Sequence, residues 1–294
     1  MATDIRQLLD EGAARLHGRC SQPRREAEIL LADALGRTRA YLLAHAEERI
    51  IDCDATDRYE AKLTRRAHGE PMAYLRGEKE FWSLPLRVGP EVLIPRPETE
   101  RLVELALDLL PADKAQAVLD LGTGSGAIAL ALARERPLCQ VLGSDISAEA
   151  VRLAEENALR VGLRNAEFRT GDWYEAAREQ RFDLIVCNPP YVADDDPRIE
   201  ADVRRFEPPG ALFAGPDGLQ ALRKVIAKAS RYLHAGGWLL VEHGDQQGAI
   251  VRELMSAAGL VAVRTARDLA GKERCSAARV SPGNTGSMNG GRPL

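Results

Sequence analysis

The chain has 294 residues, of which 45% are hydrophobic and 29% charged, and its formal net charge at pH 7 is -4. This length exceeds one typical domain, so we expect a main domain with a smaller partner. The acidic balance argues against a protein that binds nucleic acid mainly through a basic surface.

Residues 1–75 carry apolar side chains at helical spacing, which predicts a small helical domain. The expected helices begin near Ile5, Pro23, Tyr41 and Thr56. Gly36 ends the second of them. No catalytic constellation occurs in this region.

In residues 76–96 the spacing of apolar side chains changes from the helical period to the two-residue period of strands. We therefore expect a β-hairpin that links the two domains. Its expected strands, 81–88 and 91–94, flank the turn dipeptide Gly89-Pro90. A helix is expected to follow at residues 101–110, with acidic residues near its positive end.

From Ala117 the chain alternates strands and helices, which predicts an α/β fold with a parallel sheet and right-handed crossovers. The expected strands are 117–121, 140–145, 166–171, 182–187, 237–243, 261–267 and 274–280. The expected helices lie near 126–135, 147–161, 217–233 and 246–258. Only a short turn separates the last two strands, so the final strand should run antiparallel. Seven strands ending this way are typical of the Rossmann-like fold of class I S-adenosylmethionine-dependent methyltransferases. We expect that domain to span residues 97–280, followed by a disordered tail at 281–294.

A glycine-rich turn follows the first of these strands, at Gly122-Thr123-Gly124-Ser125-Gly126. Glycines let a ligand approach the backbone closely, and free amides at a helix start favour polar or anionic groups. The turn alone is ambiguous, because with Ala127 it also satisfies the relaxed dinucleotide fingerprint. A tight turn that binds nothing is the third interpretation.

Polar or aromatic residues also end the next two strands. Asp145 can accept hydrogen bonds from both ribose hydroxyls of either cofactor, or it can cap the following helix, a role for which Ser147 competes. In Gly171-Asp172-Trp173, the acid can meet an adenine amino group and the indole can pack on the ring. A lone Trp is, however, more often a core residue.

The fourth strand ends in Asn188-Pro189-Pro190-Tyr191, where open α/β sheets bind their ligands. The prolines stiffen the backbone, so the loop can present Asn188 Oδ1 and the Pro189 carbonyl in a fixed geometry beside the ring of Tyr191. Two such acceptors would each take one N–H of a planar amino or amide group and turn its nitrogen lone pair towards a methyl donor. The loop therefore predicts methyl transfer to nitrogen by orientation and electrostatic stabilisation, without a strong base. An Asn-Pro turn that merely ends the strand is the simpler alternative.

Four consecutive strands thus carry Gly122, Asp145, Trp173 and Asn188 at their carboxyl ends, so one cleft can reach them all. A dinucleotide has no use for the Asn-Pro-Pro-Tyr loop. The pattern therefore favours S-adenosyl-L-methionine as the cofactor.

The chain resembles the release-factor glutamine methyltransferase family over nearly its whole length. The motifs that carry the resemblance are Tyr74-Leu75-x-Gly77, Leu93–Glu100, Asp120–Ala129, Asp145-Ile146-Ser147, Asn188–Tyr191, Glu207-Pro208 and Gly215–Leu219. The resemblance implies methylation of the side-chain amide nitrogen of the glutamine in the Gly-Gly-Gln motif of peptide chain release factors, which modulates translation termination. It also implies that the Gly122–Gly126 turn, Asp145, Trp173 and Asn188 bind the cofactor, and that Asn188–Tyr191 hold the target glutamine. Residues 1–75 would be the release-factor docking domain.

Two alternatives remain open. A nucleic-acid methyltransferase acting on adenine or guanine amino groups uses the same loop, but it would need a basic groove and a way to capture the base. A binding module with an inactive Rossmann-like domain would be expected to have lost the glycine turn or Asn188, and both are intact.

The five cysteines are scattered and the histidines show no metal-ligand spacing, so we expect neither disulfides nor a metal. No signal peptide or apolar run of about 20 residues is evident. We therefore expect a cytoplasmic, monomeric protein that binds neither membranes nor nucleic acid directly.

Overall fold

The structure is a computed structural model, in which residues 3–283 are described. The chain divides into two compact units. The first runs to Glu78 and also includes Glu200–Phe206, whereas the second takes Lys79–Ile199 and continues from Glu207. The expected disorder of residues 284–294 lies outside the described residues.

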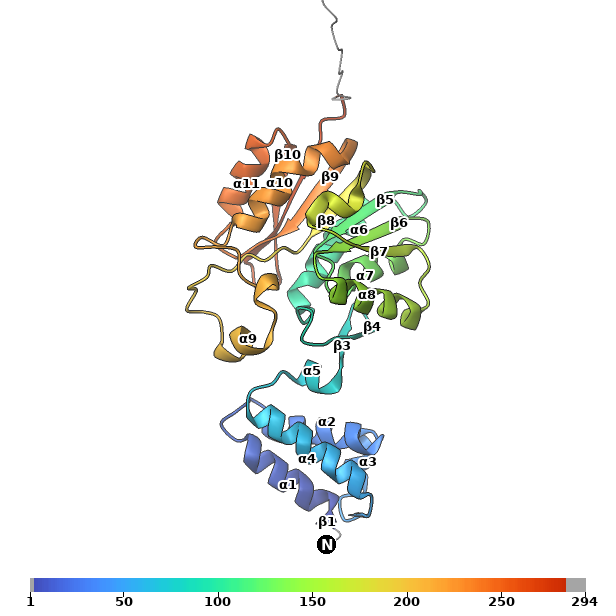
Figure 1. Ribbon diagram of the computed structural model, residues 1–294, viewed down its shortest axis with the longest axis vertical. Coiled ribbons are helices and arrows are strands. Elements are labelled where there is room, and N and C mark those ends of the chain that lie inside the picture. The colour runs from blue at the N-terminus through green and yellow to red at the C-terminus, as the bar shows by residue number, and fades with distance from the viewer. Residues whose placement is uncertain (1–2, 284–294) are drawn as a thin grey trace, which may run out of the picture. The chain divides into compact units, whose positions relative to one another are not determined.

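The first unit is a small helical bundle (Figure 1). Its helices are α1 Ile5–Leu16, α2 Pro23–Leu35, α3 Arg39–Ala44, α4 Cys53–Ala67, α5 Met72–Arg76 and α9 Ala201–Phe206. The two-residue strands β1 Thr3–Asp4 and β2 Arg49–Ile50 pair antiparallel. Tyr59 of α4 is fully buried in the core and donates its hydroxyl to the Leu8 carbonyl at 3.0 Å. The predicted helical domain is therefore present, and Gly36 ends α2 in the left-handed conformation.

A hairpin opens the second unit, but it turns at a different place from the one predicted. β3 Glu78–Phe81 and β4 Leu84–Arg87 are joined by Trp82 and Ser83, which both have positive φ, 52° and 54°. Two left-handed residues form the tight turn that matches the twist of paired strands. Gly89 and Pro90 do form a turn, closed by the Val92 amide, which donates to the Gly89 carbonyl at 3.1 Å. Residues 91–94 form no strand, so the prediction of a hairpin about this turn was wrong. The true hairpin turn was missed because neither Trp nor Ser signals such a turn in a sequence. A 3₁₀ helix η1, Pro97–Thr99, then leads into α6, Glu100–Leu109.

The second unit is built on a seven-stranded sheet in the order β10-β11-β9-β8-β5-β6-β7. The strands are β5 Ala117–Leu121, β6 Gln140–Asp145, β7 Ala166–Thr170, β8 Phe182–Cys187, β9 Leu233–Glu242, β10 Val261–Arg267 and β11 Glu273–Arg279. The neighbours from β7 to β9 pair in parallel, whereas β11 is antiparallel to both β9 and β10. This is the predicted fold, with the final strand reversed.

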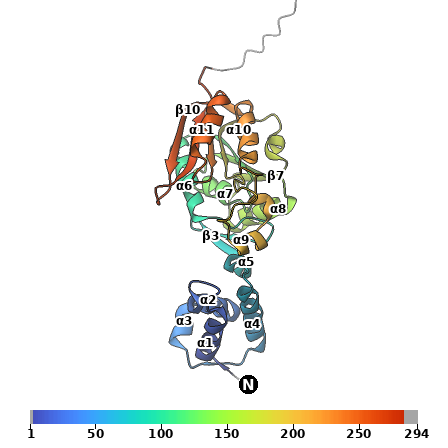
Figure 2. The ribbon, with the colours of Figure 1, turned by 90° about the vertical axis from the view of Figure 1, so that its left-hand side faces the viewer.

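Two layers of helices cover the sheet (Figures 1 and 2). The helices are α7 Ala127–Glu135, α8 Ala148–Val161, α10 Gln220–Tyr232 and α11 Gly248–Ala257, with 3₁₀ turns η2 Trp173–Ala177 and η3 Pro209–Ala211. Alternate strand residues face opposite layers: Leu184 packs with α6, α7 and α8, and Ile185 packs with α10 and α11. Both faces are buried, as expected for parallel strands made of continuous apolar runs. This rigid sheet carries the candidate site at the carboxyl ends of β5, β6 and β8.

Candidate active site

The glycine-rich turn after β5 needs glycine for two different reasons. Gly122, Gly124 and Gly126 all have positive φ, at 70°, 54° and 81°, which other residues rarely adopt. A Cβ at Gly122 or Gly124 would meet no atom within 4 Å, so the space beside them is open to a ligand. A Cβ at Gly126 would lie 3.1 Å from the Ala154 methyl group, so this glycine also lets α7 pack against α8.

Asp120 lies beneath this turn and is completely buried. Its Oδ2 accepts hydrogen bonds from the Thr123 hydroxyl at 2.7 Å and the Ala129 amide at 3.2 Å. Its Oδ1 has no hydrogen-bond partner among the described residues. Burial raises the pKa of Asp120 to about 7.

Asp145 is held by backbone amides at the end of β6. Its Oδ2 accepts from Gly124 at 2.9 Å, and its Oδ1 accepts from Ser147 at 3.0 Å. The Ser147 side chain caps α8 by accepting from the Ala150 amide at 3.1 Å. The alternative in which Asp145 is the cap is therefore wrong, and each carboxylate oxygen keeps a lone pair for another donor.

Trp173 follows β7 with φ at 51°, in the left-handed region that a bulky side chain enters only under constraint. Such strain costs on the order of 1–3 kcal/mol and is concentrated at functional sites. Ser144 donates its hydroxyl to the Trp173 carbonyl at 3.3 Å, which helps to hold this conformation. The indole is half-buried and lines the cavity together with Ile146, whose side chain is 72% exposed.

Asn188 is half-buried at the end of β8 and donates Nδ2–H to Thr99 Oγ1 at 3.1 Å. Thr99 belongs to η1 and is buried. The amide nitrogen of Asn188 is therefore engaged, which leaves Oδ1 as the atom free to accept from a substrate. Tyr191 donates its hydroxyl to Glu242 Oε1 at 3.0 Å, at the end of β9.

These groups surround one cavity of about 450 Å³, a volume within the range of small-molecule sites. The predicted site residues that line it are Gly122, Thr123, Gly124, Ser125, Asp145, Trp173, Asn188 and Pro190. Gly126, Pro189 and Tyr191 are not part of the lining. The chain between residues 3 and 283 contains no cluster of side chains suited to a metal ion.

Comparison with known proteins follows the same division of the chain. Residues 112–279 match a family described as a methyltransferase domain, and residues 7–77 match the PrmC N-terminal domain. The release factor glutamine methyltransferase of Xylella fastidiosa (strain 9a5c) is 51% identical over 254 residues, which cover 86% of this chain and 92% of that protein. Its Escherichia coli (strain K12) counterpart is 46% identical over 257 residues, covering 87% and 92%. The chain belongs to the release factor glutamine methyltransferase family.

The fold is shared more widely than this family. The crystal structure of a methyltransferase from Pyrococcus furiosus matches with a TM-score of 0.52 at 18% identity, covering 67% of this chain and 89% of that one. A likeness at this level of identity supports the class I methyltransferase fold of the second unit.

Several residues of this family member contribute to the site without having been predicted to do so. Thr99 and Glu242 lie behind Asn188 and Tyr191, and Lys224 of α10 lines the cavity. Glu242 is a charged residue that directly follows the apolar run Trp238–Val241, the one signal that the sequence offered. Burial raises the pKa of Glu242 to about 7, against the opposing effect of hydrogen bonds from Thr99 and Tyr191.

The half-buried Arg96 side chain forms an ion pair with the buried carboxylate of Glu207 beside the cavity. Glu207 Oε1 accepts from Arg96 at 2.6 Å, and its Oε2 accepts from the Ile94 amide at 3.1 Å. This contact joins the segment after β4 to the loop after the Asn-Pro-Pro-Tyr motif. The pair thereby fixes the junction ahead of α6.

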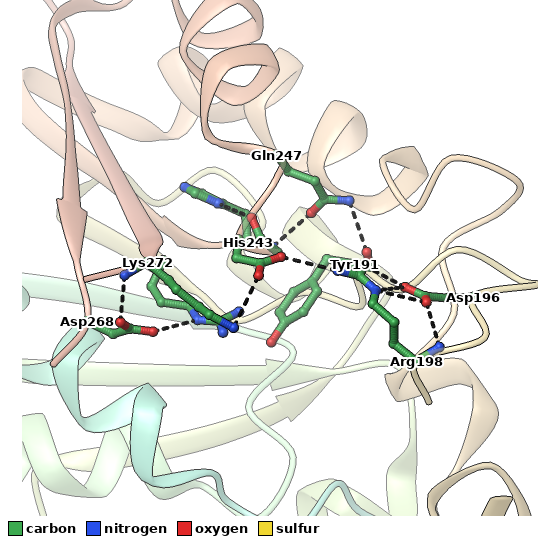
Figure 3. Close-up of polar contacts among 10 residues, drawn as sticks. Tyr191, Asp196, Arg198, His243, Gln247, Asp268 and Lys272 are labelled. Atoms are coloured by element: carbon green, nitrogen blue, oxygen red, sulfur yellow. Dashed lines mark hydrogen bonds and ion pairs between the residues drawn. The ribbon is translucent and has the colours of Figure 1, made fainter. Parts of the chain in front are cut away.

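The loop that follows Tyr191 is tied to the same end of the sheet by polar contacts (Figure 3). Gln247 Nε2 donates to the Tyr191 carbonyl at 3.0 Å. Arg198 pairs with Asp196 at 2.7 Å and with Asp245 at 3.3 Å. These contacts hold the backbone that carries and follows the motif.

Proposed function

We propose that this protein transfers a methyl group from S-adenosyl-L-methionine to the side-chain amide nitrogen of the glutamine in the Gly-Gly-Gln motif of peptide chain release factors. The observation that carries the proposal is the Asn188 amide, whose nitrogen is bound to Thr99 so that its oxygen is left to face a substrate amide. Identity of 46–51% to release factor glutamine methyltransferases over most of the chain supports the same substrate.

The residues around the cavity fit S-adenosyl-L-methionine. Asp145 offers two oxygens to the ribose hydroxyls, and the Trp173 indole offers a flat surface to the adenine ring. The open space at Gly122 and Gly124 suits the amino-acid portion, and the unsatisfied Asp120 Oδ1 provides a buried acceptor beneath the same turn. The cofactor supplies an electrophilic methyl group on a sulfonium.

The protein has to make a poor nucleophile react, because an amide nitrogen delocalises its lone pair into the carbonyl. Asn188 Oδ1 and the Pro189 carbonyl would each accept one N–H of the substrate amide, and Tyr191 would pack on its planar group. The nitrogen is then drawn towards tetrahedral geometry, with its lone pair available for in-line attack. Positioning of this kind offsets roughly 7–11 kcal/mol of a barrier, so no strong base is needed.

The first unit contains residues 1–75, and we propose that this region docks the release factor. Residues 97–280 are proposed to carry out catalysis. The helices described between residues 3 and 283 include none long and apolar enough to cross a membrane. We propose that the protein acts as a cytoplasmic monomer on a protein substrate, without binding nucleic acid directly.

Mass spectrometry tests the substrate directly. A full-length release factor is incubated with this protein and S-adenosyl-L-methionine, while an RNA and DNA mixture is treated in parallel. The expected result is a gain of one methyl group on the glutamine of Gly-Gly-Gln, absent with Asn188→Ala. Methylation of nucleic acid alone would instead support the alternative N-methyltransferase activity on adenine or guanine amino groups.

A further inference from the structure

The side chain of Asn157 on α8 is fully buried, although its amide group is polar. Its Oδ1 accepts from the Arg87 amide at 2.7 Å, and its Nδ2 donates to the Arg87 carbonyl at 3.0 Å. The same Nδ2 donates to the Ser125 carbonyl at 2.9 Å. Burial of a polar side chain is costly unless its hydrogen bonds are made, and these contacts meet that need. The chemistry above makes no use of Asn157, so its place between two backbone segments calls for an explanation.

The two hydrogen bonds to Arg87 complete the edge of the hairpin. Among the described strands, β4 pairs with β3 alone. Backbone groups that no strand pairs need other partners when they are buried, and Asn157 serves both groups of Arg87 as a neighbouring strand would. Leu86, the residue before Arg87, is fully buried in the core that the hairpin shares with α7 and α8. This part of the contact attaches the hairpin to α8.

The third hydrogen bond reaches the glycine-rich turn, where one amide differs from the rest. The amides that donate within the protein are those of Gly122, Thr123, Gly124 and Gly126. The Ser125 amide has no acceptor among residues 3–283, and Ser125 lines the cavity. It is therefore the amide of this turn that is left to donate to a ligand.

The backbone is restrained on both sides of this free amide. On one side, the Gly124 amide donates to Asp145 Oδ2 at 2.9 Å. On the other side, the Ser125 carbonyl accepts from Asn157, which limits rotation of the peptide that follows. Glycines on either side give the turn many accessible conformations, so such restraints decide where its N–H groups lie. A donor that is already in place costs less ordering when a ligand binds.

We propose that Asn157 is a positioning residue for the cofactor, which acts through the Ser125 carbonyl to hold the Ser125 amide ready for the cofactor's carboxylate. That carboxylate is the anionic group of S-adenosyl-L-methionine, and backbone amides at the start of a helix favour anions. The assignment rests on the proposed placement of the amino-acid portion beside this turn, and it does not depend on the methyl acceptor. Asn157 is not part of the cavity lining and does not itself touch the cofactor.

Isothermal titration with two matched ligands tests the assignment. The first is S-adenosyl-L-homocysteine, and the second is its decarboxylated analogue, which keeps the adenine, ribose, thioether and amino group. In Asn157→Ala, the Kd for S-adenosyl-L-homocysteine should rise about tenfold, as expected when a hydrogen bond to a charged group is lost. The Kd for the decarboxylated analogue should stay close to its wild-type value, because that ligand has no carboxylate for Ser125 to bind.

A destabilised variant of the same hairpin serves as the matched control. Leu86→Ala loosens the packing of β4 but leaves the hydrogen bond between Asn157 and Ser125 in place. Its Tm should fall, while the ratio of the two Kd values stays that of the wild type. Asn157→Ser keeps a hydroxyl in the same space and replaces Asn157→Ala if the latter does not fold. It should show the same selective loss of affinity, to a smaller extent.

A loss of affinity confined to the ligand with the carboxylate supports the assignment. Equal losses for both ligands would refute it, because they indicate a structural role, and so would unchanged Kd values in a folded variant or failure of both Asn157 variants to fold. A wild type that binds the two ligands equally well refutes the placement of the carboxylate at this turn. The release-factor assay tests the substrate separately, since these titrations contain no release factor.

Discussion

Asp145 makes the sharpest test of the cofactor site, and the change to make is Asp145→Ala. Its two oxygens each accept one backbone N–H, at 2.9 and 3.0 Å, and each retains a lone pair for a ribose hydroxyl. A hydrogen bond to a charged acceptor contributes about 1.5–3 kcal/mol. Loss of one such bond raises Kd roughly 10- to 140-fold, since 1.4 kcal/mol is a factor of ten. Isothermal titration with S-adenosyl-L-methionine measures the change.

Two further variants separate binding from folding. Asp145→Asn keeps one oxygen acceptor without the charge, so its Kd should rise less. Ser147→Ala removes the cap of α8 and should lower the free energy of unfolding by about 1 kcal/mol, with the affinity for cofactor little changed. If Asp145→Ala binds as tightly as the wild type while remaining folded, the ribose contact is not made by this residue.

Three other changes follow from the structure. Asn188→Ala should leave the Tm close to that of the wild type. The single-turnover rate of methylation should fall about 10²- to 10³-fold, which is the effect of losing one preorganised polar group. Full activity in this variant would contradict the mechanism. Glu207→Ala leaves Arg96 unpaired and the Ile94 amide without an acceptor. The free energy of unfolding, measured by urea denaturation, should therefore fall by about 2–3 kcal/mol. An unchanged urea midpoint would be inconsistent with a structural ion pair. The folded pKa of Asp120, raised to about 7 by burial, lies above its unfolded value, so its contribution to stability is present below about pH 4 and is lost as the pH rises towards 7. The stability difference between wild type and Asp120→Asn, measured by denaturation at each pH, should therefore shift by a few kcal/mol in favour of the variant between pH 4 and pH 7; a constant difference would show that Asp120 titrates normally.

Much of the second unit could be predicted because its signals are local. A short apolar run such as Phe182–Cys187 indicates a buried parallel strand, and its end indicates the position of Asn188. Turns that require positive φ were readable where glycine occupies them, as at Gly122. The turn at Trp82-Ser83 was missed because neither residue favours that backbone conformation.

Contacts between residues far apart in the chain were beyond the reach of such signals. Thr99 and Asn188 are 89 positions apart, and Tyr191 and Glu242 are 51 apart. No periodicity links them, and only the order of the strands brings β8, β9 and η1 together. The association of Glu200–Phe206 with the first unit was missed for the same reason, since this segment lies far along the chain from its helices.

The position of β11 in the sheet has a consequence for how the second unit assembles. β11 lies between β9 and β10, and it is antiparallel to both. β10 has no other strand partner in the described sheet, so it cannot join before β11 arrives. The two strands are close in sequence and can form a hairpin quickly, whereas docking β11 onto β9 closes a longer loop and is slower. Truncation before Glu273 would therefore remove an inner strand, expose the edge of β9 and leave β10 unattached, a combination that favours aggregation over a shortened but functional sheet.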